Sequence, residues 1–356
     1  MAEGEAGPIG QGMARRRRVP RRHVTLRDVA DMCGLSFKTV SRVLNAEPNV
    51  RADTRERVLA AAKSLNYHPH MAARSLVARR NFLLGLLFEN PSPNYVLDLQ
   101  MGSLERLRDE RYRLLTLPLD HKGSEGGIVA LVRSAGLDGV VLAPPLSDDA
   151  TVLEELEAAG IAFVRIASVF DDLAGPQIAT DDVDAARDMT KYLLALGHRR
   201  IAFIKGDPSH RASAVRYQGF CEAMAAAGIA VDPALVGEGA FTFASGHEAA
   251  AALIARPGRP TAIFASNDDM AAGCLIAAHE AGLAVPGDIS VVGYDDSQIA
   301  QIVWPRLTTV RQPTAAMARA ATDILLAILA DAEHREQVGF GHEIVPRASA
   351  GPAPVI

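Results

Sequence analysis

The chain has 356 residues, of which 49% are hydrophobic and 22% charged, as in ordinary globular proteins. This length exceeds what one compact core accommodates, so it predicts two or three domains. Residues 1–80 carry 16 basic and 7 acidic side chains, a net charge of +9, whereas the remainder carries −14. The basic N-terminal part therefore favours a polyanionic partner, which the acidic remainder would repel.

Several classes of protein are disfavoured by composition. No run of about 18 apolar residues occurs, so the sequence predicts no membrane-spanning helix. Residues 1–22 are rich in Arg, Gly and Pro without the apolar segment of a secretory signal, and we expect a disordered basic extension. Its arginines either lie along DNA phosphates or form a solvated tail. The cysteines, Cys33, Cys221 and Cys274, are far apart and indicate buried thiols in a reducing, cytoplasmic compartment.

Residues 23–68 are expected to fold as an all-α helix-turn-helix unit. Thr25 and Asp28 have the spacing of a capped helix start, and Gly34 can adopt the positive φ that ends the helix. A second helix begins at Ser36 with apolar residues inward, and a third follows from Asp53. An ordinary helical hairpin would show the same pattern. The open face of the second helix carries polar, basic and aromatic side chains suited to a DNA major groove, namely Phe37, Lys38, Thr39, Ser41, Arg42 and Asn45.

The amino-acid sequence of this unit closely resembles that of a known family. Val-Thr-Leu-Arg-Asp-Val-Ala at 24–30 and Gly-Leu-Ser-Phe-Lys-Thr-Val-Ser-Arg-Val-Leu-Asn at 34–45 are similar to the N-terminal signature of the lactose-repressor (LacI/GalR) family of bacterial transcription regulators. The resemblance implies a homodimer on pseudo-palindromic operator DNA. The DNA-binding residues that follow are Thr25, Ser36, Phe37, Lys38, Thr39, Ser41, Arg42 and Asn45.

Residues 69–81 are expected to join the helical unit to the rest of the chain. The stretch from Met71 to Arg80 is too short for a stable isolated helix, so it should become ordered only in contact with a partner. The resemblance implies a hinge helix that folds on operator DNA and inserts Leu76 into the minor groove. A plain flexible linker is the alternative.

From residue 82 onward, buried apolar strands alternate with amphipathic helices. This pattern predicts parallel sheets covered on both faces, and there are too many strand-helix units for one sheet. The resemblance, which extends through the stretches 265–273, 288–296 and 307–313, implies a two-lobed α/β core similar to periplasmic binding proteins. We expect one lobe from residues 82–180 and 310–335, the other from 181–309 and 336–349, and a tail at 350–356.

Candidate effector-binding residues lie close to the ends of predicted strands, where ligands bind in such folds. Asn267 and Asp295 each follow a strand, and Arg216 is expected to open the helix after the strand at 201–204. An amide, a carboxylate and a guanidinium suit adjacent hydroxyl groups. Helix capping, turn formation and packing between lobes are the alternatives. The predicted effector-binding set is Tyr95, Arg165, Arg216, Phe241, Asn267, Asp295 and Trp304, in which Arg165 departs from the family pattern and faces either the ligand or a salt-bridge partner.

The sequence lacks the motifs of common enzyme classes and any His or Cys pattern for a metal, so we predict no enzymatic activity, cofactor or metal. The predicted function is that of a transcriptional repressor controlled by a small molecule, a sugar or sugar derivative. A purine-type or other non-sugar corepressor and a solute-binding transport protein are the alternatives. The segment from Gly351 to Ile356 cannot form a coiled coil, which favours a dimer over a tetramer.

Overall fold

The computed structural model describes residues 24–44, 50–67, 80–89, 92–119, 127–167 and 169–354. The chain divides into two compact units, Met1–Arg79 and Arg80–Ile356. The predicted basic extension and two of the predicted DNA contacts, Asn45 and Leu76, lie outside the described residues, as does most of the predicted hinge. None of the described helices combines the length and the apolar character that crossing a bilayer requires.

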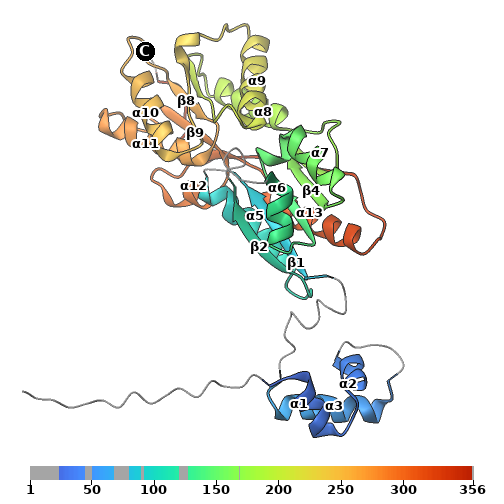
Figure 1. Ribbon diagram of the computed structural model, residues 1–356. Helices are drawn as coiled ribbons and strands as arrows, with labels where there is room; N and C mark the ends of the chain where they lie inside the picture. Colours follow the sequence, from blue (N-terminus) through green and yellow to red (C-terminus); the bar gives the residue numbers. More distant parts are fainter. Residues whose placement is uncertain are drawn as a thin grey trace, which may run out of the picture. The chain divides into compact units, whose positions relative to one another are not determined.

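The N-terminal unit contains α1 (Leu26–Cys33), α2 (Phe37–Leu44) and α3 (Ala52–Ser64) (Figure 1). Thr25 and Asp28 form the predicted capping box, and Gly34 ends α1 with a φ of 62°. Val29, Val40 and Val58, one from each helix, are fully buried in a shared core. The three helices therefore pack as one small domain, rather than as a hairpin alone.

The C-terminal unit holds two six-stranded sheets (Figure 1). The first is parallel, in the order β11-β5-β4-β3-β1-β2, and the second, in the order β12-β10-β9-β8-β6-β7, is parallel except for β12. The strands of the first sheet are β1 (Leu83–Phe88), β2 (Arg113–Pro118), β3 (Gly139–Leu142), β4 (Ala162–Ala167), β5 (Gln177–Thr180) and β11 (Gln337–Phe340). Those of the second are β6 (Ile201–Ile204), β7 (Val236–Gly237), β8 (Ala262–Ala265), β9 (Ser290–Asp295), β10 (Thr308–Arg311) and β12 (Glu343–Val345).

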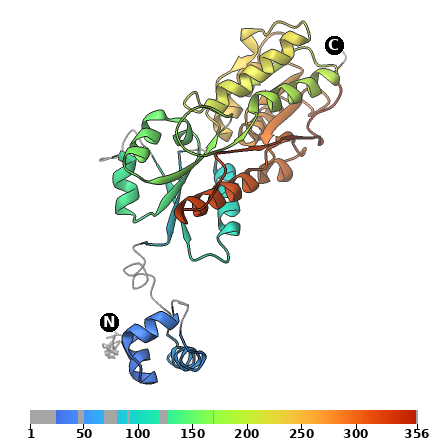
Figure 2. The ribbon, with the colours of Figure 1, turned by 90° about the vertical axis from the view of Figure 1, so that its right-hand side faces the viewer.

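Helices cover both faces of each sheet, which explains why most of the central strands are continuously apolar. The first lobe has α5 and α13 on one face and α6 and α7 on the other, and the second has α8 and α9 opposite α10 and α11 (Figure 2). The first lobe contains α5 (Pro93–Arg106), α6 (Gly127–Ser134), the short 3-10 helix η1 (Leu146–Asp148), α7 (Ala150–Ala158) and α13 (Thr314–Leu329). The second contains α8 (Asp182–Ala195), α9 (Arg211–Ala226), the 3-10 helix η2 (Pro233–Leu235), α10 (Phe243–Ile254), α11 (Asp268–Glu280) and α12 (Gln298–Ile302).

The chain passes between the two lobes three times, after β5, after β10 and after β11. The first crossing agrees with the predicted boundary at 180/181. The other two predicted boundaries, at 309/310 and 335/336, were wrong. Strand β10 continues to Arg311 in the second sheet, and β11 pairs with β5 in the first sheet. The alternately exposed residues of β11 show no apolar run, so this edge strand could not be recognised from the residue pattern.

Candidate effector pocket and DNA-binding surface

Helix α2 presents the surface predicted to contact DNA. Ser36 caps this helix, since its Oγ accepts a hydrogen bond from the Thr39 backbone N–H at 3.1 Å. Phe37, Lys38 and Arg42 are exposed, and the Phe37 side chain remains 60% exposed despite its apolar ring. Thr25, by contrast, uses its hydroxyl in the cap of α1, where it donates to Asp28 at 2.7 Å. Three of the predicted DNA contacts are therefore exposed on α2.

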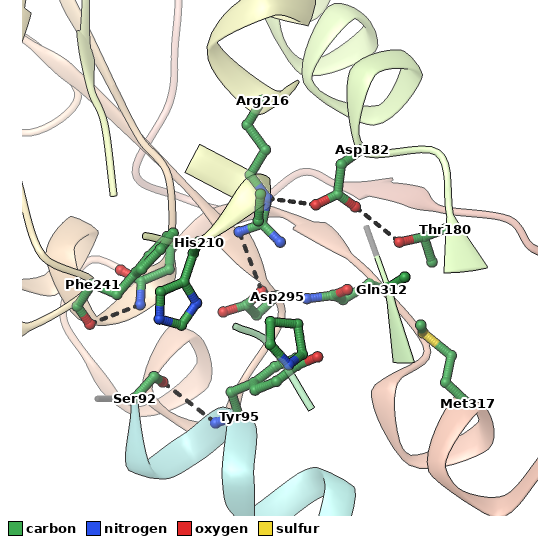
Figure 3. A pocket seen from close by; sticks show the side chains of 14 residues that line it. Ser92, Tyr95, Thr180, Asp182, His210, Arg216, Phe241, Asp295, Gln312 and Met317 are labelled. Atoms are coloured by element: carbon green, nitrogen blue, oxygen red, sulfur yellow. Dashed lines mark hydrogen bonds and ion pairs between the residues drawn. The ribbon is translucent and has the colours of Figure 1, made fainter. Parts of the chain in front are cut away.

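A pocket lies between the two lobes, at the carboxyl ends of strands from both sheets (Figure 3). Five of the seven predicted effector contacts line it, and several residues that the sequence did not single out join them. The lining residues are Ser92, Tyr95, Pro144, Ala167, Thr180, Asp182, His210, Ala212, Arg216, Phe241, Asn267, Asp295, Gln312 and Met317.

Arg216 is the charged centre of this pocket, on the second turn of α9 rather than at the helix start that was predicted. Its Nε donates to Asp182 at 2.9 Å, and its Nη1 donates to the Ser266 carbonyl at 2.6 Å. The guanidinium carbon lies 3.6 Å from the centroid of the Tyr294 ring, a cation–π contact. Asp182 also accepts hydrogen bonds from Thr180 and from the Tyr294 hydroxyl. Burial opposes the charged form of Arg216, but the nearby carboxylates raise its pKa, so it stays cationic.

Asp295 ends β9 and points toward Arg216 in the pocket (Figure 3). Its φ of 113° is uncommon for a residue other than glycine. Its Oδ1 accepts a hydrogen bond from Gln312 at 2.6 Å and lies 3.8 Å from Nη1 of Arg216. Burial raises the pKa of Asp295 to about 7, although Arg216 and Gln312 act in the opposite direction. Near neutral pH this carboxyl group can therefore accept or donate hydrogen bonds.

Asn267 and Phe241 line the same pocket and also have structural roles. Asn267 caps α11 by accepting from the Met270 backbone N–H at 2.9 Å, and its Nδ2 donates to the Phe241 carbonyl at 3.0 Å. The Phe241 ring packs over Gly206, where a Cβ atom would overlap the ring. It also lies edge-on to the buried ring of His210, with centroids 5.3 Å apart. Burial lowers the pKa of this histidine and keeps it neutral. Capping and packing are thus combined with a position at the pocket wall.

The wall from the first lobe is built around the start of α5. Ser92 caps this helix, and Tyr95 follows one turn later with its ring at the pocket. Ser92 Oγ also donates to Asp269 of α11 at 2.5 Å, and Asn94 Nδ2 donates to the same carboxylate at 2.9 Å. Burial raises the pKa of Asp269, while these two hydrogen bonds lower it. This contact fastens the start of α5 to the second lobe.

Two predicted effector residues do not line the pocket. Arg165 is fully buried in the first lobe, where its guanidinium binds Asp171 at 2.8 and 2.9 Å, so the salt-bridge alternative describes this residue. Trp304 follows α12 and is 87% exposed at the surface. Neither side chain is among the residues that line the pocket.

Sequence reasoning missed pocket residues at the crossings between lobes. Thr180 and Asp182 flank the first crossing, and Gln312 lies at the second. The predicted crossing at 180/181 could have indicated Thr180 and Asp182, since each crossing passes the cleft, whereas Gln312 lies beyond the predicted boundary at 309/310. Among the described residues, one group has the spacing of metal ligands, but it is partly exposed and two of its members already pair with Arg187 and Lys191; it consists of Asp184, Asp188 and His342.

Comparisons with known proteins agree with this architecture. Residues 25–70 match the family of bacterial regulatory proteins of the lacI family, and residues 190–350 match the periplasmic binding protein-like domain. The HTH-type transcriptional regulator AglR of Rhizobium meliloti is 33% identical over 343 residues, covering 93% of this chain and 95% of that protein.

Solved structures show the same arrangement. The lac repressor dimer bound to operator and the anti-inducer ONPF is 28% identical with a TM-score of 0.80, over 93% of this chain and all of that one. The transcriptional regulator CelR in complex with cellobiose is 29% identical with a TM-score of 0.69, over 92% of this chain and all of that one.

A helix-turn-helix unit joined to a two-lobed core defines a class of DNA-binding transcriptional regulators. More specifically, the chain belongs to the lacI family of bacterial regulatory proteins. The predicted family and fold class are confirmed. The family consists of transcriptional regulators and not of enzymes, as the sequence also indicated.

Proposed function

We propose that this regulator is a repressor whose affinity for operator DNA is controlled by a neutral polyhydroxylated effector, a sugar, bound between the lobes. It acts in the cytoplasm as a homodimer, with α2 of each subunit in successive major grooves of a pseudo-palindromic operator. Phe37, Lys38 and Arg42 contact base edges, while Thr39 and Ser41 lie near phosphates. The observation that carries the choice of effector is the charge balance around Arg216.

Arg216 does not offer a net positive charge to a ligand. Asp182 binds its Nε at 2.9 Å, and Asp295 lies 3.8 Å from its Nη1. The other basic side chain among the lining residues is His210, whose pKa burial lowers. A phosphate or carboxylate entering the pocket would meet these acidic groups without an uncompensated cation, and its desolvation would be costly. An anionic effector is therefore disfavoured.

Neutral hydroxyl groups fit the same surroundings. Asp295 and Gln312 offer acceptors, Arg216 offers donors, and the rings of Tyr95 and Phe241 provide apolar surface for the face of a sugar ring. The related CelR forms a complex with cellobiose, a neutral sugar. A purine-type effector would use the aromatic side chains for stacking, and it remains the second candidate.

A thermal-shift screen tests the class of effector, because a ligand specific to the native state raises the melting temperature. The panel contains neutral mono- and disaccharides, the matching sugar phosphates and uronates, and nucleobases. We expect stabilisation by at least one neutral sugar and none by its phosphate. Asp295→Ala should remove this shift, whereas Glu154→Gln on the exposed face of α7 should preserve it. Stabilisation by an anionic sugar or by a nucleobase alone would contradict the proposal.

Exposed apolar side chains support the homodimer. Leu97, Met101 and Leu104 repeat at helical spacing on α5 and are 43%, 56% and 43% exposed. Trp304 and Ile302 of the second lobe are exposed to an even greater extent. Apolar stripes of this kind on a water-soluble surface indicate contact with another protein, and a second copy of the chain is the partner that a two-fold operator requires.

A further inference from the structure

A charged contact joins the two lobes outside the effector pocket. Asp171 belongs to the segment between β4 and β5 of the first lobe, and Arg211 is the first residue of α9 in the second lobe. Arg211 Nη1 donates to Asp171 Oδ2 at 2.6 Å. The same carboxylate also accepts two parallel hydrogen bonds from the Arg165 guanidinium. One aspartate therefore connects a strand of one lobe to a helix of the other.

The first-lobe side of this contact is rigidly built. The Arg165 side chain is fully buried, and its remaining donors bind the carbonyl groups of Ser147 at 2.6 Å and Leu173 at 3.3 Å. The Asp171 side chain is only 11% exposed. Although burial favours the neutral form, hydrogen bonds from Arg165 and the Leu173 N–H bring the pKa of Asp171 below its ordinary value. Asp171 is thus ionised at neutral pH and fixed in place for Arg211.

An effector in the pocket does not touch this contact directly. Arg165, Asp171 and Arg211 are all absent from the pocket lining, although His210 and Ala212 on either side of Arg211 belong to it. The other contact between lobes described above, from Ser92 to Asp269, involves a lining residue and is open to direct influence by a ligand. The two contacts therefore differ in how an effector can act on them.

We propose that the Asp171–Arg211 pair is an interlobe clasp, which favours the closed arrangement of the lobes independently of the effector and so sets how strongly the regulator responds to it. Arg165 is the positioning residue of this clasp. The inference rests on the proposed function only in assuming that lobe closure is what the effector changes. A contact of fixed strength outside the pocket shifts the equilibrium between open and closed lobes by its own free energy.

Hydrogen exchange in the full chain measures lobe opening without effector or operator. Arg211→Gln is the informative variant, because it breaks the bridge but leaves the Arg165–Asp171 pair intact, so no buried charge loses its partner. We expect amides at 143–149 and 205–210, the segments that contain the lining residues Pro144 and His210, to exchange about two- to fivefold faster, the range for one partly exposed ion pair. Arg211→Lys keeps the charge and should restore part of the protection.

Arg187→Gln is the matched control, since it removes ion pairs with Asp184 and Glu222 that lie wholly within the second lobe. Its exchange at the two cleft segments should equal that of the parent. Unchanged exchange in Arg211→Gln, with a parental melting temperature, would overturn the clasp, as would an equal increase in Arg187→Gln. Because the measurement uses no ligand, unchanged exchange would not contradict the proposed effector class. A negative sugar screen, in turn, would not contradict the clasp.

Discussion

Tyr294 and Arg216 contact each other and share a third residue. The Arg216 guanidinium lies 3.6 Å from the Tyr294 ring centroid, and both side chains hydrogen-bond to Asp182 at 2.9 Å. The three residues come from β9, α9 and α8 of the second lobe and are almost completely buried. The direction of the guanidinium is thus set within one lobe, so little ordering remains to be done when an effector binds.

Tyr294→Phe should test this arrangement. The variant keeps the ring under Arg216 and removes only the hydroxyl that donates to Asp182, which retains its bonds to Thr180 and Arg216. We expect a loss of about 1 kcal/mol in the free energy of unfolding, the usual value for one buried hydrogen bond. Urea denaturation measures it. Tyr192→Phe, which removes a hydroxyl at a partly buried position of α8, should have nearly the parental free energy of unfolding. A parental value for Tyr294→Phe would show that its hydroxyl contributes nothing to stability.

Asp148 gives the protein a specific pH dependence. Both carboxyl oxygens are shielded from solvent without a hydrogen-bond partner, and burial raises the pKa to about 6, even though Arg165 and Arg211 act against it. The native state therefore binds this proton more tightly than the unfolded chain, whose pKa is about 3.9. Ionisation of Asp148 consequently lowers stability as the pH rises from about 4 to about 6.

Asp148→Asn removes this ionisation and should stabilise the protein above pH 6, by on the order of 2 kcal/mol. At pH 4 most of the advantage should disappear, because the native aspartate is then neutral and the unfolded one is only about half ionised. Denaturation of parent and variant at pH 4, 6 and 8 measures the difference. Glu154→Gln, an exposed carboxylate on α7, serves as control. A constant difference at all three pH values would rule out an ionising Asp148 as its cause.

The sequence was sufficient for the parts of the fold that depend on local patterns. The cap at Thr25, the turn at Gly34 and the buried strands each follow from residue types at fixed spacing, and the structure contains them. The clasp was not predictable in this way. Arg165 and Asp171 are six residues apart, but Arg211 reaches them only because α9 of the other lobe begins beside the segment after β4.

The pocket shows the same limit. Asn267 and Asp295 could be found because each lies at the carboxyl end of a strand. Gln312 enters the pocket because the chain crosses between lobes just after β10, whose length local patterns do not define. Asp182 lies beside the crossing that was expected at 180/181 and could have been found. Trp304 shows the converse limit, since an aromatic side chain after a predicted strand suggests a ligand platform, whereas this ring lies on the surface outside the pocket lining.

Lys38→Ala should separate base recognition from general attraction to DNA. Lys38 is exposed on the first turn of α2, beside Phe37. If it contacts a base edge, its loss should weaken operator binding by about 1–3 kcal/mol and leave binding to random duplex nearly unchanged. Titrations with operator and random fragments at several salt concentrations measure both. An equal loss on both DNAs, with a shallower salt dependence, would instead place Lys38 at a phosphate.

Met101→Asp should dissociate the proposed homodimer. Met101 is the most exposed of the three apolar residues on α5, so a carboxylate there costs little in the monomer. Buried in an interface without a partner, the same charge would be strongly unfavourable, and we expect the dimer dissociation constant to rise about tenfold or more. Sedimentation velocity at micromolar concentration measures it. Thr151→Asp, which adds the same charge at the exposed start of α7, should remain dimeric. A dimer of parental strength in Met101→Asp would place the subunit interface away from this stripe of α5.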